Sequence, residues 1–558
     1  MARDPDQTGA FVFDLVDDDT DLEPPAAAAG SAAAETPDDD GAELVGPPPS
    51  AGLGGRLRVL APVAALLAVV LGTGFAVDGV RDSVRMERMR DARGGVVDVS
   101  SPLEETWAWE GAVGPFGSMT RGLTNDVAVL GGLLAFQSER RLVGLDPATG
   151  DEAWVVELGA APDCGPMGYA GLAEITASTL VCVAGTDRDR QVTVVGPDGV
   201  AGAARSLGTA DLRRYGRARP GPDGTVLRAQ RVGPEPVGAL DSVECTESTW
   251  ECTGTVEAGR DLEIRAEDAV TGEERWSVTV PFRPTAADRC NNWSGTSWSS
   301  TGGTTDFEQM IDTEGFGART TGELVRLYGC GIEAGVTTTG EVLGLGLEPG
   351  MSEVSPVSGG GYIEYEYDED EDDVRITLYS AEGDVVREFD GRRRVLEPDA
   401  VDTVEPGLLI AVGPDAPEMR AYEVDGSQRW GVSSPADVTR FIAQVAGTAV
   451  VASWSGMIHG LDLATGAERW SWNVSDTDEA QPGEWYEMRG FTDGDSVLLA
   501  THSGNGGIGM VSLDARSGAV LWEREASADR TGGGFDRGLV AVDGNLVDVT
   551  PRGVRGLG

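Results

Sequence analysis

Residues 460–470 read GLDLATGAERW, and this stretch decides the fold because the chain repeats it. Three other stretches keep Asp eight residues before Trp, and a further one, AYEVDGSQRW, has a shorter turn. The recurring residues are Asp146, Gly150, Trp154, Asp268, Gly272, Trp276, Asp462, Gly466, Trp470, Asp514, Gly518 and Trp522, with Gly426 and Trp430 in the shorter copy. This regular return predicts a repeated structural unit.

The repeated unit is predicted to be a β-hairpin with a fixed turn. The side chain of Asp462 can open the turn by accepting bonds from its own backbone, and Gly466 can adopt the positive φ that the turn requires. The strand that leaves the turn begins at Trp470 and alternates as a half-buried strand does. We expect the small residue two positions before Asp, such as Gly460, to leave room for an indole of the neighbouring unit. A single hairpin cannot bury an indole, so the units are expected to stack.

The spacing of the tryptophans predicts a β-propeller. Trp430, Trp470 and Trp522 are 40 and 52 residues apart, which is the length of a four-stranded propeller blade. The longer gaps contain three weaker turns, which lie around Gly199, Gly340 and Gly383. Together with the five clear turns they predict an all-β fold with eight blades, or seven as the alternative.

The two ends of the propeller are expected to complete each other. Trp107 and Trp109 belong to a strand-like stretch that has no blade of its own, and residues 539–557 contain strands without an outgoing tryptophan. Pairing between them would remove exposed sheet edges, which otherwise invite aggregation.

One apolar run sets the domain boundaries. Val59–Val77 carries no charge over 19 residues, enough to cross the roughly 30 Å hydrocarbon layer as a helix. The acidic stretch before it is rich in Ala and Pro and is predicted to be disordered. We therefore expect a cytoplasmic tail at residues 1–56, a transmembrane helix at 57–78, a juxtamembrane helix or linker at 79–99 and the propeller at 100–558.

The cysteines favour a propeller outside the cytoplasm. All six follow the apolar run, and their number and spacing suit an oxidising compartment. The expected pairs are local, although other pairings are open on sequence grounds: Cys164 with Cys182, Cys245 with Cys252, and Cys290 with Cys330. The arginines between Arg81 and Arg93 favour the opposite orientation by the positive-inside rule. Acidic residues alternate with them as on a helix ending at Gly94, so we place the protein in the cell membrane, single-pass, with a cytoplasmic N-terminus.

Composition excludes several classes of function. The chain has 43 basic residues, all of them Arg, against 93 acidic ones, for a net charge of −50. Such a charge repels nucleic acid, so no nucleic-acid partner is expected. Only His459 and His502 could supply imidazole for zinc binding or acid–base chemistry, and neither has ligand-spaced partners.

The repeats resemble the tryptophan-docking motif of the pyrroloquinoline-quinone (PQQ) repeat β-propellers, over residues 100–558. This superfamily includes quinoprotein dehydrogenases and non-catalytic envelope-assembly propellers. For a dehydrogenase the resemblance implies a calcium ion held by Glu, Asn and Asp, a catalytic Asp and a disulfide between adjacent cysteines. This chain has no adjacent cysteines, and no motif in it carries the calcium ligands or the catalytic Asp. We therefore assign no catalytic, cofactor-binding or metal-binding residue.

The expected function is binding or scaffolding by a non-catalytic propeller on a single-pass membrane anchor. The partner would be a protein or a small molecule at a propeller face, and neither PQQ nor calcium is expected. The alternative is a PQQ-dependent, dehydrogenase-like oxidoreductase. The acidic run at residues 368–373 is expected to be a solvated hairpin loop, since it lacks the spacing of a calcium-binding loop. The polar segment after Cys290, with Trp293 and Trp298, is either a binding loop or a loop without function.

Overall fold

Antiparallel sheets of at least four strands follow one another along the chain. The computed structural model describes residues 83–115, 126–169, 176–186, 189–200, 202, 204–246, 251–290, 311–344, 352–358, 360–367, 374–389, 394–403, 407–413, 418–433, 435, 438–473, 488–502, 508–524 and 538–558. All of them belong to the second of two compact units, Met1–Thr73 and Gly74–Gly558. In this part of the chain there are nine sheets with four or more strands, which we number I to IX in chain order.

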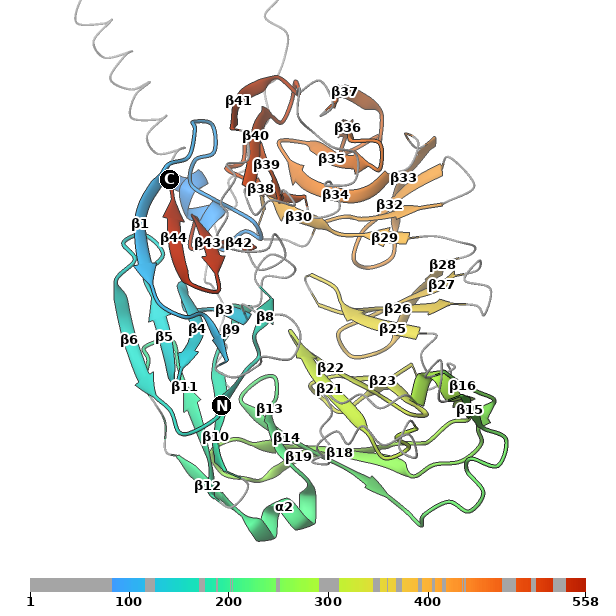
Figure 1. Ribbon diagram of the computed structural model, residues 1–558. Helices are drawn as coiled ribbons and strands as arrows, with labels where there is room; N and C mark the ends of the chain where they lie inside the picture. Colours follow the sequence, from blue (N-terminus) through green and yellow to red (C-terminus); the bar gives the residue numbers. More distant parts are fainter. Residues whose placement is uncertain are drawn as a thin grey trace, which may run out of the picture. The chain divides into compact units, whose positions relative to one another are not determined.

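Each sheet has four main strands, which run from the inside of a ring to its outside (Figure 1). From sheet I to sheet IX, the first strands are β3 (Asp126–Leu130), β7 (Asp163–Gly165), β13 (Ala218–Pro220), β21 (Phe316–Thr321), β25 (Ser352–Pro356), β29 (Arg394–Leu396), β34 (Val438–Val445), β38 (Arg489–Thr492) and β42 (Gly538–Val542). The second strands are β4 (Leu133–Glu139), β10 (Leu180–Thr186), β14 (Thr225–Val232), β22 (Leu324–Gly329), β26 (Tyr362–Tyr367), β31 (Leu409–Val412), β35 (Thr448–Ser453), β39 (Ser496–His502) and β43 (Asn545–Thr550).

The outer half of each sheet contains the predicted hairpin. The third strands are β5 (Arg141–Leu145), β11 (Asp189–Val195), β18 (Asp261–Asp268), β23 (Ile332–Val336), β27 (Val374–Tyr379), β32 (Glu418–Tyr422), β36 (Met457–Asp462), β40 (Ile508–Asp514) and β44 (Gly553–Leu557). The fourth strands are β6 (Glu152–Glu157), β12 (Arg205–Gly208), β19 (Glu274–Val280), β24 (Val342–Leu343), β28 (Val385–Phe389), β33 (Gln428–Ser433), β37 (Glu468–Asn473), β41 (Val520–Arg524) and, in sheet IX, β1 (Glu105–Glu110).

The remaining elements are shorter and lie outside the four main strands of each sheet. They are β2 (Gly114–Pro115), β8 (Gly168–Tyr169), β9 (Thr176–Ala177), β15 (Glu244–Thr246), β16 (Glu251–Thr253), β17 (Thr255–Val256), β20 (Thr285–Ala286), β30 (Pro398–Val401), the helix α2 (Thr209–Tyr215) and the 3₁₀ helix η1 (Ala287–Cys290). The strands β15, β16, β17 and β20 form two small sheets beside sheet III, next to η1.

The hydrophobic core is divided into layers between neighbouring sheets. Second strands such as β35 are buried along their whole length, because residues on both faces of a sheet pack against a neighbour. Separate buried clusters join each sheet to the next, from I and II through VIII and IX, and one more joins IX back to I. The nine sheets therefore form a closed ring.

The closing sheet confirms that the two ends of the propeller meet. Strand β1 pairs antiparallel with β44, with Trp107 opposite Gly556 and Glu110 opposite Gly553. The eight predicted turns, including those at Gly199, Gly340 and Gly383, join the third and fourth strands of sheets I to VIII. The expected count of eight blades, or seven, is corrected to nine in the described part of the chain. Sheet IX has no such turn, because its fourth strand comes from the other end of the ring.

The segment before β1 begins as a helix at residues 83–91 and stops at Gly94, where φ is +62°, as the arginine-rich pattern predicts. Within the described residues no helix is long and apolar enough to span a membrane. The expected anchor at 57–78 and the acidic tail lie outside the described residues. So do the acidic run at 368–373 and the segment with Trp293 and Trp298.

Candidate functional site

The motif tryptophans join neighbouring sheets. In each case the indole Nε1 donates a hydrogen bond to a backbone carbonyl of the next sheet in the ring or, for Trp522, to the segment before β1. The pairs are Trp107 with Pro147 at 3.1 Å, Trp154 with Pro197 at 3.1 Å, Trp276 with Thr338 at 2.8 Å, Trp430 with Leu463 at 2.8 Å, Trp470 with Ala515 at 3.0 Å and Trp522 with Val99 at 2.8 Å. Each motif tryptophan therefore links its own sheet to the next one, and we call such a contact between neighbouring sheets a joint.

Glycines in motif turns and on third strands make room for indoles, and the structure shows which glycine meets which ring. A Cβ on the turn residue Gly518 would lie 2.5 Å from the ring of Trp470 in the preceding sheet, so the turn glycine receives the neighbour's indole. A Cβ on Gly460 would lie 2.1 Å from Trp470 of its own sheet. The expectation that Gly460 faces a neighbouring indole is wrong, because Gly460 and Trp470 are paired across adjacent strands.

The motif aspartates hold the turns. Oδ1 of Asp462 accepts bonds from the backbone N–H groups of Ala464 and Thr465, at 3.1 and 2.8 Å, and from the Thr465 hydroxyl at 2.8 Å. Its other oxygen pairs with Arg469, the residue before the motif tryptophan. Bonding from Thr465 and from Arg469 lowers the pKa of Asp462 to about 2. The carboxylate is thus ionised at any physiological pH, and its role is structural.

Three disulfides lie in the half of the ring where the sequence repeat is least clear. The pairs are Cys164–Cys182, Cys245–Cys252 and Cys290–Cys330, the same local pairs that the spacing predicts. Cys164 and Cys182 lie opposite each other on β7 and β10, and Cys245 and Cys252 lie opposite each other on β15 and β16.

Sequence reasoning missed a buried ion cluster at the joint between sheets II and III. Sheet II has no motif tryptophan, and Arg205 of β12 takes its place over Gly272 of the next turn. Arg205 pairs with the buried Glu267 at 3.0 Å, and Arg265 pairs with the same carboxylate at 3.1 Å. No sequence signal marks it, because Arg205 follows Gly199 by six residues, whereas each motif tryptophan follows its turn glycine by four.

The helix at residues 83–91 and the segment after it are bound to one end of the ring, where the motif turns lie. Arg85 pairs with Asp495 at 2.7 Å, and the buried Asp493 accepts a bond from the backbone of Val99 at 3.2 Å. The backbone of Ala515, in the motif turn of sheet VIII, donates to Asp495 at 3.0 Å, which places both features at the same end. Further along, the backbone of Val97 donates to Gly544 of sheet IX at 2.8 Å.

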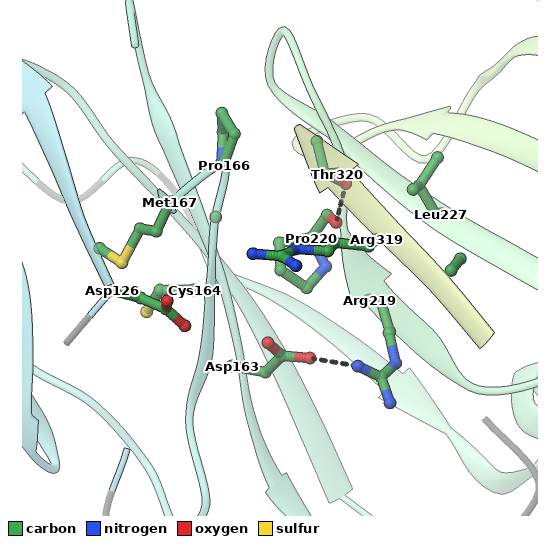
Figure 2. A pocket seen from close by; sticks show the side chains of 12 residues that line it. Asp126, Asp163, Cys164, Pro166, Met167, Arg219, Pro220, Leu227, Arg319 and Thr320 are labelled. Carbon is green, nitrogen blue, oxygen red and sulfur yellow. Dashed lines mark hydrogen bonds and ion pairs between the residues drawn. The ribbon is translucent and has the colours of Figure 1, made fainter. Parts of the chain in front are cut away.

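A polar cavity of ≈ 180 Å³ opens among the first strands of sheets I to IV (Figure 2). Its lining comes from β3, β7, β13, β14 and β21 and consists of Asp126, Asp163, Cys164, Gly165, Pro166, Met167, Arg219, Pro220, Leu227, Ala318, Arg319 and Thr320. The disulfide of Cys164 fixes the wall at β7, and a bond from the Thr320 hydroxyl to the Pro220 carbonyl, at 3.5 Å, links β21 to β13. Strands of four sheets thus converge on one small space.

The charged side chains in this cavity differ in how closely they are paired with an opposite charge. Asp163 faces Arg219 at 3.9 Å, a loose pair in which 45 % of the Asp163 side chain is exposed. Desolvation by the surrounding walls raises the pKa of Asp163, and the charges of Arg219 and Arg190 partly offset this effect. Figure 2 shows the Arg319 side chain extending from β21 into the cavity. Its guanidinium makes no hydrogen bond or ion pair with the part of the chain that the structure describes.

The ionisable groups that line the cavity are carboxylates and guanidinium groups. Its lining residues include no histidine, and their one cysteine is in a disulfide, so they lack a nucleophile paired with an imidazole base. Among the described residues no group of three or more His, Cys, Asp or Glu side chains could hold a metal ion. His459 pairs with Glu468, Nδ1 to Oε2 at 3.1 Å, on the outer part of sheet VII, and nothing is described of the His502 side chain.

Comparisons with known proteins agree with the repeat. Residues 369–552 match the family model described as outer membrane protein assembly factor BamB, which confirms the resemblance to PQQ-like repeat propellers there. No curated protein sequence matches the chain at a significant level. Among solved structures, BamB from Moraxella catarrhalis has 14% identity, covers 68% of this chain and 93% of its own, and gives a TM-score of 0.28. The computationally designed Ika8 protein has 9% identity, with 81% of this chain and 98% of that chain covered and a TM-score of 0.30. Both TM-scores are low, so we base no inference on these two likenesses.

Proposed function

We propose that this chain, part of which matches the BamB family model, is a membrane-anchored, non-catalytic β-propeller that binds a partner outside the cytoplasm. A ring of sheets with a loop-bearing end suits binding, because loops on a rigid scaffold carry contact residues without disturbing the core. The match to an envelope-assembly family supports a protein partner or a scaffold role.

The observation that carries this proposal is the attachment of residues 83–99 to the motif-turn end of the ring. The expected anchor at 57–78 precedes this segment directly, so the motif-turn end would face the membrane. The turn between β35 and β36 and the turn between β43 and β44 lie at the opposite end of their sheets, since strands alternate in direction. That opposite end is the one presented to partners.

The orientation of the propeller outside the cytoplasm is supported by the three disulfides. Bonds of this kind persist in oxidising compartments and are rare in a reducing cytosol. They stand against the arginines that follow the expected anchor, several of which have partners on the ring: Arg85 pairs with Asp495 and Arg93 with Glu397. The presence of arginine at these positions is therefore accounted for by ion pairs within the fold as well as by the positive-inside rule.

The proposal includes the absence of a quinone cofactor and of calcium. It is tested by titrating the protein with PQQ and calcium in a calorimeter and following its visible absorption. Saturable binding together with reduction of a dye by an alcohol or a sugar would favour the dehydrogenase alternative.

The partner is sought with photo-crosslinking residues placed at each end of the ring in the native membrane. Trp454, 57% exposed, and Arg552 report on the far end, whereas Ala148 and Ala464, exposed in motif turns, report on the near end. We expect a partner to crosslink from Trp454 or Arg552 and not from the two alanine positions. Crosslinks only from Ala148 and Ala464 would mean that the motif-turn end is the contact surface and that the proposed presentation is wrong.

A further inference from the structure

We propose that the cavity between β7, β13 and β21 binds the carboxylate of a small, singly charged ligand, with Arg319 as its cationic partner. This inference rests on the proposed function and deepens it, because it names the ligand class of the binding module. The carboxylate belongs either to a free short-chain acid or to the C-terminal residue of a peptide.

The first argument is the state of Arg319. Its side chain extends into the cavity and is exposed to solvent, and it has no polar partner in the part of the chain that the structure describes. By contrast, the buried arginines nearby are engaged: Arg228 donates to the Gly216 carbonyl at 2.9 Å and Arg231 to the Cys330 carbonyl at 2.9 Å. A guanidinium presents a planar fork of donors that matches a carboxylate with two parallel bonds.

The second argument limits the charge of the ligand. Asp126 and Asp163 line the same cavity, and the whole chain carries −50. These negative charges oppose a dianion such as phosphate more strongly than a monocarboxylate, since repulsion grows with the charge of the ligand. A single carboxylate directed at Arg319 satisfies the open cation at the smallest electrostatic cost.

The third argument concerns the rest of the ligand. The lining is mainly polar, because Pro166, Pro220 and Leu227 are buried and, of the larger apolar side chains, only Met167 is partly exposed. The cavity has a volume of ≈ 180 Å³. It has room for a small monocarboxylate.

The test is calorimetric titration of the full-length protein in detergent with 4-methylpentanoate, and separately with its uncharged amide. We expect saturable binding of the acid in the millimolar range or tighter and at least tenfold weaker binding of the amide. No saturation by the acid, or equal binding of acid and amide, would overturn the proposal.

The matched variants are Arg319→Gln and Arg375→Gln. Both remove one positive charge, but Arg375 lies on the surface of sheet V with 69% of its side chain exposed and pairs with Glu366. We expect Arg319→Gln to raise the Kd of the acid at least tenfold and Arg375→Gln to leave it within about twofold. Equal loss in both variants would mean that only the net charge matters, and the site would be rejected. Unchanged melting temperatures in the two variants show that both are folded.

A tripeptide ending in leucine, with a free or an amidated C-terminus, separates the two sources of the carboxylate. Tighter binding of the free peptide than of the small acid assigns the site to a peptide terminus, and the reverse assigns it to a free acid. Failure of all these ligands, with partner crosslinks still obtained from Trp454 or Arg552, would reject the carboxylate site and leave the proposed function standing.

Discussion

At the residue scale, five of the nine sheet joints place one indole against one turn glycine. The positions of Asp, Gly and Trp could be predicted from the sequence because the turn chemistry is local. The partner of each ring could not, because Gly460 and Gly518 are both small residues next to a motif turn, and only the packing shows that one faces its own indole and the other a neighbour's. The cavity was also beyond prediction, since Asp163, Arg219 and Arg319 are far apart in sequence and meet only when sheets II, III and IV pack together.

We expect Trp470→Ala to lower the free energy of unfolding by about 3–5 kcal/mol, through lost burial and a cavity between sheets VII and VIII. The ring is 9% exposed and donates to the Ala515 carbonyl at 3.0 Å. Thermal or denaturant unfolding measures the effect. Trp454→Ala, at a site that is 57% exposed, is the control and should change stability by less than about 1 kcal/mol. Equal stability of wild type and Trp470→Ala would mean that Trp470 does not hold sheets VII and VIII together.

Glu333 should make stability depend on pH. Desolvation raises the pKa of Glu333 from 4.5 to about 7, against the opposing charge of Arg326. The folded state therefore binds a proton that the unfolded state releases, so the contribution of Glu333 to stability is greatest below pH 4.5 and is lost as pH rises through 7, by on the order of 3 kcal/mol. Denaturant unfolding at several pH values should show this slope in wild type and not in Glu333→Gln. Glu353→Gln, which removes the other carboxylate on Arg326, should keep the slope; if it abolishes the slope, the assignment to Glu333 is wrong.

At the element scale, the joints between neighbouring sheets differ in the side chains that form them. Sheets II, IV and V lack a motif tryptophan, and side chains of other kinds contact the next turn: Arg205 over Gly272, Glu341 over Gly383 and Val386 over Gly426. At the joint of sheets IV and V the buried cluster is small, consisting of Leu324, Leu343, Val354 and Tyr362 among the described residues. These sheets could be predicted only weakly from sequence, because their turns keep the glycine but have lost the tryptophan.

Amide hydrogen exchange should find this joint to be the least protected part of the ring. We expect β24 and β25, on either side of it, to exchange faster than β36 and β37, whose joint is held by Trp470. Local opening is easiest where few apolar groups are buried. Uniform protection across all nine sheets would show that the ring opens only as a whole, and it would contradict the ranking of joints by their buried clusters.

At the scale of the whole molecule, the ring is closed by a sheet made from both ends of the chain. The all-β class, the eight turns and the meeting of the two ends could all be predicted, since they rest on local hairpins and on unpaired strands at each end. The number of sheets was underestimated, because turns were counted and sheet IX has no motif turn.

Deletion of residues 553–558 should destabilise the whole ring. It removes β44, the partner of β1, and exposes two sheet edges at once. We expect loss of a single cooperative thermal transition and increased aggregation, measured by calorimetry and light scattering. Deletion of residues 1–56, before the expected anchor, is the control and should leave the transition of the ring unchanged. A cooperative transition that survives loss of β44 would show that closure is dispensable.

The pairing of Glu110 with Gly553 also has a consequence for how the protein is made. At roughly 5–20 residues per second, the ribosome needs on the order of tens of seconds to synthesise the chain between these two residues. Throughout that interval β1, with Trp107 and Trp109, has no sheet to join. Folding of the ring must therefore finish after translation, and a chain released early by a nonsense codon near its end would carry seven or eight formed sheets and still be a substrate for proteases.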